Sequence, residues 1–122
     1  MKRRDPKSTS GSKKPPLHLI PPVAEIQESI ALKSGADKHG PWNWREHRIE
    51  LMEHIAAVKR HIARFVDGEE GDPETGVSPL AHARATLGII LDAQAQGTLI
   101  DDRPRKGKGA ATLERLTKRR RR

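Results

Sequence analysis

The feature that most restricts the fold is a helical repeat of apolar residues that glycine and proline interrupt. Apolar side chains recur at steps of three and four in three segments, residues 23–34, 45–67 and 77–96. This is the spacing of one face of an α-helix. Gly40-Pro41 and the segment around Pro73 break the repeat. The pattern predicts an all-α fold, a small bundle of about three to four helices.

The ends of these segments carry typical helix caps. Pro22 suits a first helical turn, where its missing N–H costs little. Ser78 is the predicted N-cap of the third helix, with Pro79 in the first helical position. Gly35 and Gly97 are predicted to end the first and third helices.

Charge divides the chain into three parts. Residues 1–14 hold six Lys or Arg and one acid, and residues 103–122 hold ten and one. Residues 15–102 hold eight basic and fourteen acidic residues, a net charge of −6. Polar, charged ends without periodicity are typical of disorder. We therefore predict disordered basic tails at 1–14 and 105–122, around one all-α domain at 15–104.

Composition excludes several classes of protein. The chain has no Cys, which excludes disulfides, thiolate zinc sites and a cysteine nucleophile. No run approaches the roughly 20 apolar residues of a membrane span, and the N-terminus lacks the apolar stretch of a secretory signal. We expect a cytoplasmic protein without membrane contact. One Phe, two Trp and no Tyr predict a thin core, which a homo-oligomer, a dimer or tetramer, would supplement.

Acidic and histidine side chains gather around the break before the third helix. Between His61 and His82 the chain holds four acids in six residues, which are Glu69, Glu70, Asp72 and Glu74. Carboxylates suit Mg²⁺ and Mn²⁺, and imidazole suits the later transition metals. The same residues also fit an ordinary turn with capping acids. Glu50 and Glu53 either join His61 in a metal-filled groove or belong to a solvated helix face.

Two tryptophans fall within three residues in a chain that is otherwise poor in aromatic side chains. Trp42 and Trp44 flank Asn43 and follow Lys38. One interpretation is that the indoles fill the core. The other is that they form a wall for a nucleobase or sugar, with Asn43 and Lys38 as polar contacts, and we expect one indole in each role.

Six short pieces, in order, carry a resemblance to a known family. They are LHLIPP (17–22), SGADKHGPWNW (34–44), RH (60–61), GEEGDPETG (68–76), LAHA (80–83) and IDDRP (100–104). The chain resembles the phage and bacterial dATP/dGTP diphosphohydrolase N-terminal domain family, relatives of the MazG-like all-α nucleotide pyrophosphohydrolases. The resemblance implies an oligomeric helical bundle that cleaves a deoxynucleoside triphosphate, dGTP or dATP, to its monophosphate and pyrophosphate. Some phage relatives use this reaction to feed the synthesis of 2-aminoadenine DNA.

The resemblance also implies a divalent cation, Mg²⁺ foremost, with Mn²⁺ or Co²⁺ as alternatives. A triphosphate carries about four negative charges, so an acidic site needs a cation to bridge carboxylates to phosphates and to activate water. The expected metal ligands are His61, Glu69, Asp72 and His82. A further carboxylate, Glu53 or Glu70, would orient the attacking water as base.

The remaining assignments concern the substrate. Lys38 and Arg60 would stabilise the leaving pyrophosphate, and Asn43 with Trp44 would hold the base or sugar. Asp101 and Asp102 either support the metal ligands or anchor the C-terminal hook of the domain by salt bridges.

The chain departs from the family pattern at several positions. Pro79 stands where a second histidine is expected and Thr86 where asparagine is expected. His39 replaces an aromatic residue, and Arg64-Phe65 replaces an aromatic pair. These departures bear on activity and substrate choice more than on the fold.

Two other functions compete with cleavage. A non-enzymatic accessory protein would bind nucleic acid through the two basic tails, with a steep dependence on salt. A degenerate relative would bind nucleotides without cleaving them, which the residues Pro79 and Thr86 suggest. The nucleic-acid-binding alternative accounts for the two ends of the chain but not for the acidic centre and its histidines.

Overall fold

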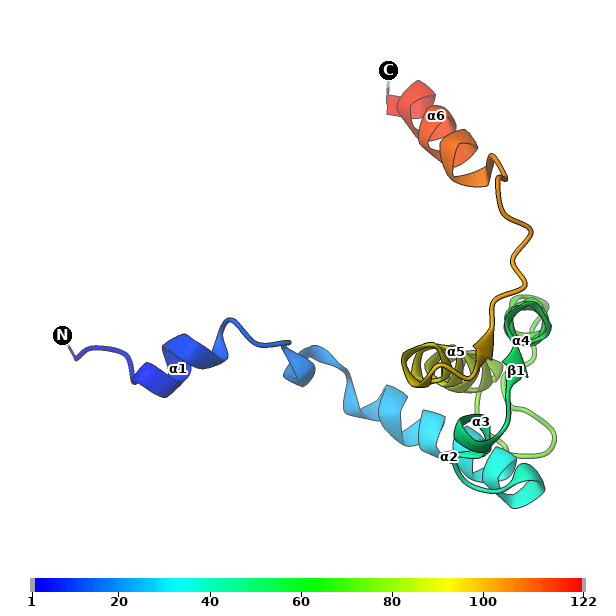
Figure 1. The fold of residues 1–122 in the computed structure, drawn as a ribbon, viewed down its shortest axis with the longest axis horizontal. Helices are drawn as coiled ribbons and strands as arrows, with labels where there is room; N and C mark the ends of the chain where they lie inside the picture. Colours follow the sequence, from blue (N-terminus) through cyan, green and yellow to red (C-terminus); the bar gives the residue numbers. More distant parts are fainter. Residues whose placement is uncertain (1, 122) are drawn as a thin grey trace.

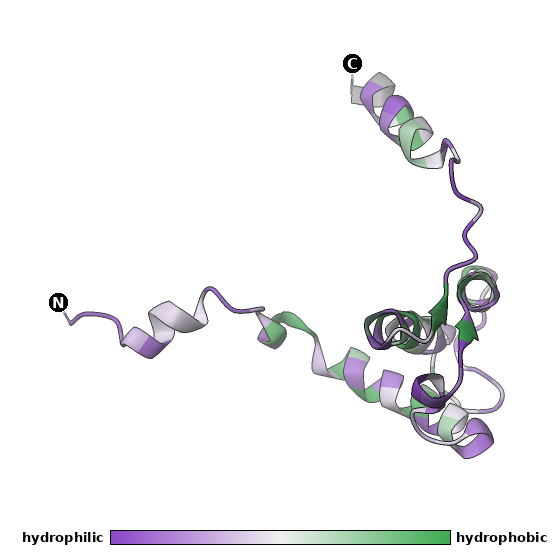
Figure 2. Ribbon diagram, viewed as in Figure 1, coloured by the Kyte–Doolittle hydropathy of each residue, from purple (hydrophilic) through white to green (hydrophobic). Residues whose placement is uncertain are grey.

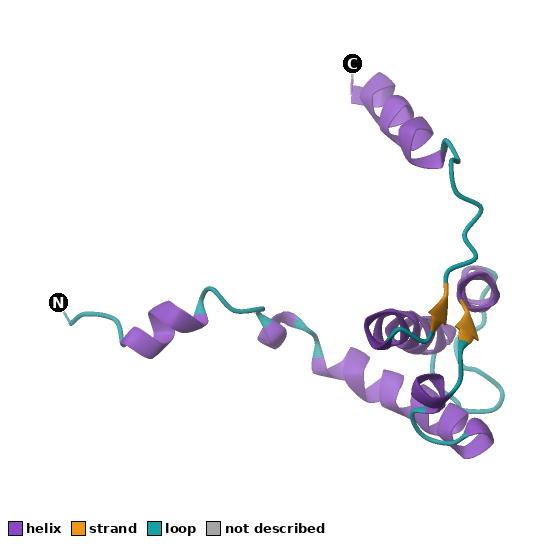
Figure 3. Cartoon of the chain, viewed as in Figure 1, coloured by secondary structure: helices purple, strands orange, loops and turns teal. Residues whose placement is uncertain are grey.

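Six α-helices, a single 3-10 turn and two very short strands make up the described part of the chain. The computed structural model describes residues 2–121 (Figure 1). The elements in chain order are α1 (Pro6–Gly11), η1 (Leu17–Leu19), α2 (Pro22–His39), α3 (Asn43–Glu46), β1 (Ile49–Glu50), α4 (Leu51–Val66), α5 (Pro79–Gln96), β2 (Leu99–Ile100) and α6 (Gly109–Arg121). The predicted all-α class is confirmed, and Figure 3 shows how little strand there is.

Helix α5 is the centre of the body. It packs most extensively against α4 and also against α2, and α3 contacts its C-terminal part. Small side chains make this possible, because four of the buried residues are alanines of α5, at positions 81, 83, 85 and 93. The larger buried side chains include Ile49, Leu51, Val58 and Ile90. The core is thin, as the composition predicts.

Three of the four predicted helix caps are confirmed. Pro22 opens α2, and the Ser78 hydroxyl accepts the Leu80 N–H at 3.1 Å with Pro79 at the first position of α5. Gly97 ends α5 in the left-handed region, at φ 80°. Gly35 does not end α2, which continues to His39. The stop comes at Gly40, at φ 90°, because Pro41 then disfavours continuation.

The predicted helix over 45–67 is wrong at its start, before Leu51. Residues 43–46 form α3, the chain then extends through β1, and α4 begins only at Leu51. The cause is a tertiary contact. Ile49 pairs in parallel with Leu99 of β2, and its N–H donates to the Thr98 carbonyl at 3.0 Å. This pairing across the sequence overrides the local helical repeat.

The C-terminal hook is anchored to the body by Asp102. Asp102 Oδ1 accepts the Met52 N–H at 2.9 Å and so caps α4 from the other end of the domain. Asp101 forms ion pairs with Arg103 and Arg105, at 2.6 and 3.0 Å. Asp102 thus anchors the hook, by a hydrogen bond in place of the predicted salt bridge, whereas the ion pairs of Asp101 lie within its own segment.

Both basic tails contain helix where the sequence predicts disorder. Helix α1 has no buried residue, and within α6 only Thr112 is partly covered among the side chains described. Both helices stand away from the body in Figure 1. Because short helices without tertiary packing are marginal in water, disorder of the tails in solution stays a prediction. No helix among residues 2–121 is long and apolar enough to cross a bilayer.

Candidate active site

A polar pocket of about 320 Å³ lies where α2, α3, α4, α5 and the loop between α4 and α5 meet. Helix α2 presents small residues to it, Ala31, Ser34, Gly35 and Ala36, which leave the space open. The polar side chains that line it are Ser34, Lys38, His39, Asn43, His54, His61, Asp72, Glu74, His82 and Thr86. Six of the ten predicted site residues line this one pocket, which are Lys38, Asn43, Trp44, His61, Asp72 and His82.

His61 of α4 and His82 of α5 form the inner wall of the polar pocket. Their rings stack, with centroids 5.2 Å apart and planes inclined by 26°. Burial lowers the pKa of His61 first of all, and the neighbouring His82 lowers it further. The His61 imidazole is therefore neutral at physiological pH, with a nitrogen lone pair available to an incoming group.

Asp72 brings a carboxylate to the same wall. Its Oδ1 lies 3.9 Å from His82 Nε2 and accepts the backbone N–H groups of Glu74 and Thr75, at 2.8 and 3.1 Å. Burial raises the pKa of Asp72, but these two hydrogen bonds and the nearby histidines outweigh it, and the net shift is downward. The side chain is 11% exposed, so the pocket contains a mostly buried, ionised carboxylate.

Thr75 fixes the orientation of His82. Its Oγ1 lies 2.7 Å from His82 Nε2, while the backbone of the same turn closes between Asp72 and Val77 at 2.7 Å. Helix α4 contributes a second histidine, His54, whose Nδ1 lies 2.7 Å from the Glu50 carbonyl. Sequence reasoning missed His54 as a pocket residue and Thr75 as the partner of His82. The seven-residue step from His54 to His61 was the available signal, since it places both on one helix face.

Four of the predicted site residues do not line the polar pocket. Glu53, Arg60 and Glu70 are exposed. Glu69 is partly buried, and its Oε2 atom has no hydrogen-bond partner although it is shielded from solvent. Among residues 2–121 no three His, Asp or Glu side chains stand close enough together to hold a metal ion as they are.

Lys38 and Glu74 face each other at the entrance. They form an ion pair at 2.8 Å, and both line the polar pocket although each side chain is about half exposed. Lys38 is the one predicted phosphate-binding cation that reaches the pocket.

Comparison with known proteins fits this geometry. Residues 4–103 match the family described as dATP/dGTP diphosphohydrolase, N-terminal. The chain belongs to this family. It is also 34% identical over 90 residues to the dATP/dGTP diphosphohydrolase of Salmonella phage PMBT28, an alignment that covers 74% of this chain and 30% of the relative. The chain thus spans under a third of the relative's length. No solved structure matches it.

At two positions, Pro79 and Thr86, the chain departs from the pattern expected of the dATP/dGTP diphosphohydrolase N-terminal family, and the structure shows what each residue does instead. Pro79, where a histidine is expected, is completely buried at the start of α5 and so serves packing and the helix start. Thr86, where asparagine is expected, lines the polar pocket, but its hydroxyl donates to the His82 carbonyl at 3.0 Å. The polar pocket keeps its histidine and carboxylate without either expected side chain.

Proposed function

We propose that the polar pocket cleaves a purine deoxynucleoside triphosphate, dGTP or dATP, to the monophosphate and pyrophosphate. Membership in the family supports this, as does the name of the Salmonella phage relative. The observation that carries the proposal is that His61, Asp72 and His82 converge beside Lys38 in one pocket. Imidazole, carboxylate and ammonium groups in one place suit phosphate chemistry better than they suit a packed core.

We further propose that the reaction requires a divalent cation, with Mg²⁺ foremost and Mn²⁺ or Co²⁺ as alternatives. The groups that would hold it are His61, Asp72 and His82 of the polar pocket, together with Glu69, which lies outside the pocket lining and whose Oε2 atom has no hydrogen-bond partner. Mg²⁺ commonly binds one or two protein carboxylates and takes its other ligands from phosphates and water, so a preformed cluster of three side chains is not needed. When bound, the ion would offset phosphate charge and lower the pKa of a water molecule.

Glu74 is the carboxylate we propose as base, in place of Glu53 and Glu70. Those two are exposed and outside the polar pocket, whereas Glu74 lines it. In the structure Glu74 pairs with Lys38. A bound triphosphate would compete for the Lys38 ammonium, and this would free the Glu74 carboxylate to orient water. Lys38 would then stabilise the leaving pyrophosphate.

We propose that the protein works as a homo-oligomer. Its apolar arm, residues 17–30, includes side chains that are 60 to 71% exposed, which are Leu17, Leu19, Val23 and Ile26. Figure 2 shows apolar stretches of the arm on η1 and on the first turns of α2, which stand clear of α4 and α5. The accessible surface is 10151 Å², against about 6,600 Å² for a compact chain of this mass. Part of this excess is the arm, which a second copy would cover.

Product analysis tests the proposed reaction. The full chain is incubated with each dNTP and NTP in the presence of Mg²⁺, Mn²⁺ or Co²⁺, and the products are separated by ion exchange. We expect a purine deoxynucleoside monophosphate and intact pyrophosphate. Release of orthophosphate, or no turnover from a folded sample, would contradict the proposal. Asp72→Asn and Glu74→Gln should each lower kcat about 100-fold or more, while Asp67→Asn, on an exposed residue outside the pocket, should not.

A further inference from the structure

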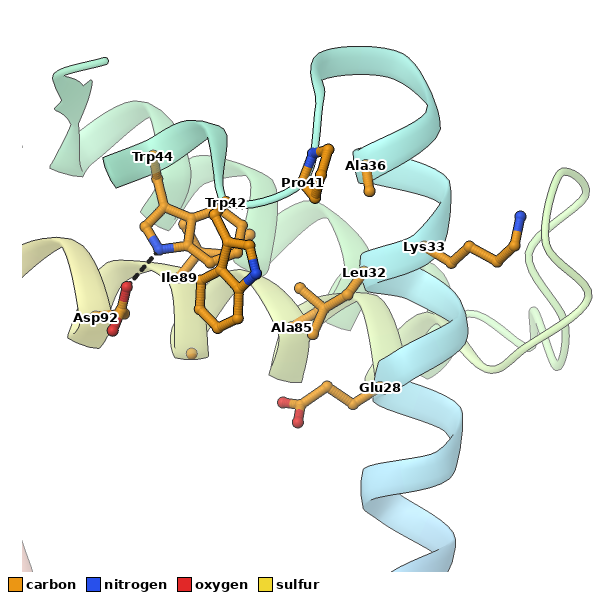
Figure 4. A pocket seen from close by; sticks show the side chains of 11 residues that line it. Glu28, Leu32, Lys33, Ala36, Pro41, Trp42, Trp44, Ala85, Ile89 and Asp92 are labelled. Atoms are coloured by element: carbon orange, nitrogen blue, oxygen red, sulfur yellow. Dashed lines mark hydrogen bonds between the residues drawn. The ribbon is translucent and has the colours of Figure 1, made fainter. Parts of the chain in front are cut away.

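A second pocket, of about 400 Å³, adjoins the polar pocket on the other side of Trp44. It is enclosed by α2, the segment from Pro41 to Trp44 and α5, as Figure 4 shows. Five residues line both pockets, which are Leu32, Ala36, Trp44, Ala85 and Ile89. We call this second space the tryptophan pocket. A ligand that occupies the two pockets would place one part among cations and carboxylates and another part on apolar side chains.

Trp42 lines the tryptophan pocket in an unusual state. Its backbone is left-handed, with φ 61° and ψ 26°, which is costly for a bulky residue. The side chain is 55% exposed, so core burial does not explain it. The Arg45 guanidinium lies 4.4 Å from the ring centroid, and Trp44 stands at 5.3 Å with its plane tilted by 49°. A large, oriented and exposed aromatic surface beside an apolar pocket is suited to stacking a flat ring.

Gly88 keeps the floor of the tryptophan pocket open. It lies inside α5, where glycine is less favourable than alanine. A Cβ atom at this position would come within 3.7 Å of Glu28 Oε2 and otherwise meet nothing. The fold therefore does not need glycine here for lack of space, and the missing side chain leaves room for a ligand.

Glu28 supplies the polar recognition group. Of the two carboxylates that line the tryptophan pocket, Asp92 already accepts hydrogen bonds on both oxygens, from Trp44 and Arg45. Glu28 has an ion contact with Arg84 at 3.3 Å, but Arg84 Nε is a buried donor without a hydrogen-bond partner. In Figure 4 the Glu28 carboxylate extends from α2 toward the space below Trp42. Its oxygens can therefore accept hydrogen bonds from a ligand.

We infer that the tryptophan pocket is the nucleobase subsite of the proposed reaction, and that Glu28 makes it prefer guanine. Guanine presents two adjacent donors, N1–H and the N2 amino group, which one carboxylate can accept together. Adenine presents one donor beside an acceptor nitrogen, which a carboxylate repels. This inference rests on the proposed function only in the identity of the full substrate, a purine deoxynucleoside triphosphate with its phosphates in the polar pocket.

Intrinsic fluorescence tests the subsite without any reaction. The chain has two tryptophans, and both line the tryptophan pocket, so their emission reports on its occupancy, and through Trp44 also on the wall that it shares with the polar pocket. The full chain is titrated with 2′-deoxyguanosine, 2′-deoxyadenosine and thymidine in the presence of EDTA. These nucleosides carry no phosphate, so binding depends on neither a metal nor turnover. We expect saturable quenching, with deoxyguanosine bound about tenfold or more tightly than deoxyadenosine.

Three variants make the test specific, each checked for helix content by circular dichroism. Trp42→Ala should weaken the binding of deoxyguanosine about fivefold or more, because a stacking surface is lost. The fluorescence of Trp44 measures binding in this variant. Glu28→Gln should bring the two purine nucleosides to nearly equal affinity. Glu25→Gln makes the same chemical change on the same helix outside the tryptophan pocket. It should change the affinity for neither deoxyguanosine nor deoxyadenosine.

The outcomes separate this inference from the proposed function. No saturable quenching by any nucleoside from a folded chain, or equal effects of the changes at Glu28 and Glu25, would overturn the subsite. Bound deoxyguanosine without dNTP cleavage would reject the proposed reaction and keep the subsite. Cleavage of dNTPs without nucleoside binding would support the proposed reaction and reject the subsite.

Discussion

The indole N–H of Trp44 donates to Asp92 Oδ2 across 2.6 Å and ties the segment after α2 to the C-terminal part of α5. Arg45 reinforces the link through two hydrogen bonds to the same carboxylate, at 2.9 and 3.0 Å. Trp44 is a wall of both pockets, so this carboxylate sets the position of the surface that the two pockets share. Asp92 is thus a positioning residue for the site.

The first prediction concerns the pH dependence of this link. Hydrogen bonds from Arg45, and then from Trp44, hold the pKa of Asp92 below its ordinary value. A depressed folded-state pKa contributes stability that is complete above the unfolded pKa and is lost as pH falls through the folded value. Asp92→Asn should therefore lower the melting temperature at pH 7 and lose this effect as the pH falls below about 4. Melting curves between pH 3 and 8 measure it, and a pH-independent difference would contradict the assignment.

A second prediction concerns the effect of Gly88 on stability. Gly88→Ala should raise the free energy of unfolding by about 0.4–1 kcal/mol, because alanine has fewer conformations to lose in the unfolded chain and the nearest contact is ordinary. Urea denaturation at constant m-value measures the change. Gly35→Ala is the matched control inside α2, since a Cβ atom there would meet nothing within 4 Å. Destabilisation by Gly88→Ala would show that the floor of the tryptophan pocket is tighter than the structure has it.

Asp102 gives the third prediction, because it caps a helix that begins fifty residues earlier. Asp102→Ala should lower the free energy of unfolding by about 0.5–2 kcal/mol, the range for loss of an N-cap acceptor. Asp102→Asn retains an acceptor oxygen and should recover most of the loss. Asp101→Ala removes only ion pairs with Arg103 and Arg105 at the surface and should stay close to the unmodified chain. Urea denaturation measures the stability of each variant. Equal losses of stability for Asp101→Ala and Asp102→Ala would contradict the capping role of Asp102.

Much of the fold and part of the site could be predicted from local patterns. The start of α5 at Ser78-Pro79 and its end at Gly97 depend on the chemistry of single residues, which is written in the sequence. The meeting of His61, Asp72 and His82 follows from a helix, a short turn and a second helix that packs back on the first. Where the determinants are local, sequence reasoning succeeds.

The missed features depend on distant partners or on helix rotation. The extended segment at Ile49 exists because Leu99 lies beside it, fifty residues away. The position of Trp44 depends on Asp92 in the same way. Glu53 shares the polar side of α4 with His61 in the amino-acid pattern, yet packing against α5 turns His54 and His61 inward and leaves Glu53 exposed. The rotation of a helix about its axis is decided by its neighbours, which a single sequence does not contain.

The fourth prediction tests the proposed oligomer through the apolar arm. Val23 and Ile26 are 66 and 60% exposed, on a part of α2 that lies outside the two described pockets. Replacing both with Glu should leave the helix content unchanged and convert the assembly to monomer, because carboxylates are costly to bury in an interface. Analytical ultracentrifugation over a range of concentrations measures this. A monomeric unmodified chain would contradict the oligomer directly.

The fifth prediction separates the enzyme from the competing nucleic-acid-binding protein. Residues 1–14 and 105–122 carry most of the positive charge, around an acidic centre. Binding of non-specific duplex DNA should weaken steeply with salt, because each phosphate contact releases counterions. Deleting both segments should abolish DNA binding and leave dNTP cleavage per folded site unchanged, since neither segment lines the polar pocket. Fluorescence anisotropy at several salt concentrations measures DNA binding, and product analysis measures dNTP cleavage.

Two outcomes would contradict this prediction. Loss of cleavage when the tails are deleted would mean that the tails belong to the site. A chain that binds DNA but cleaves no nucleotide would favour the accessory role.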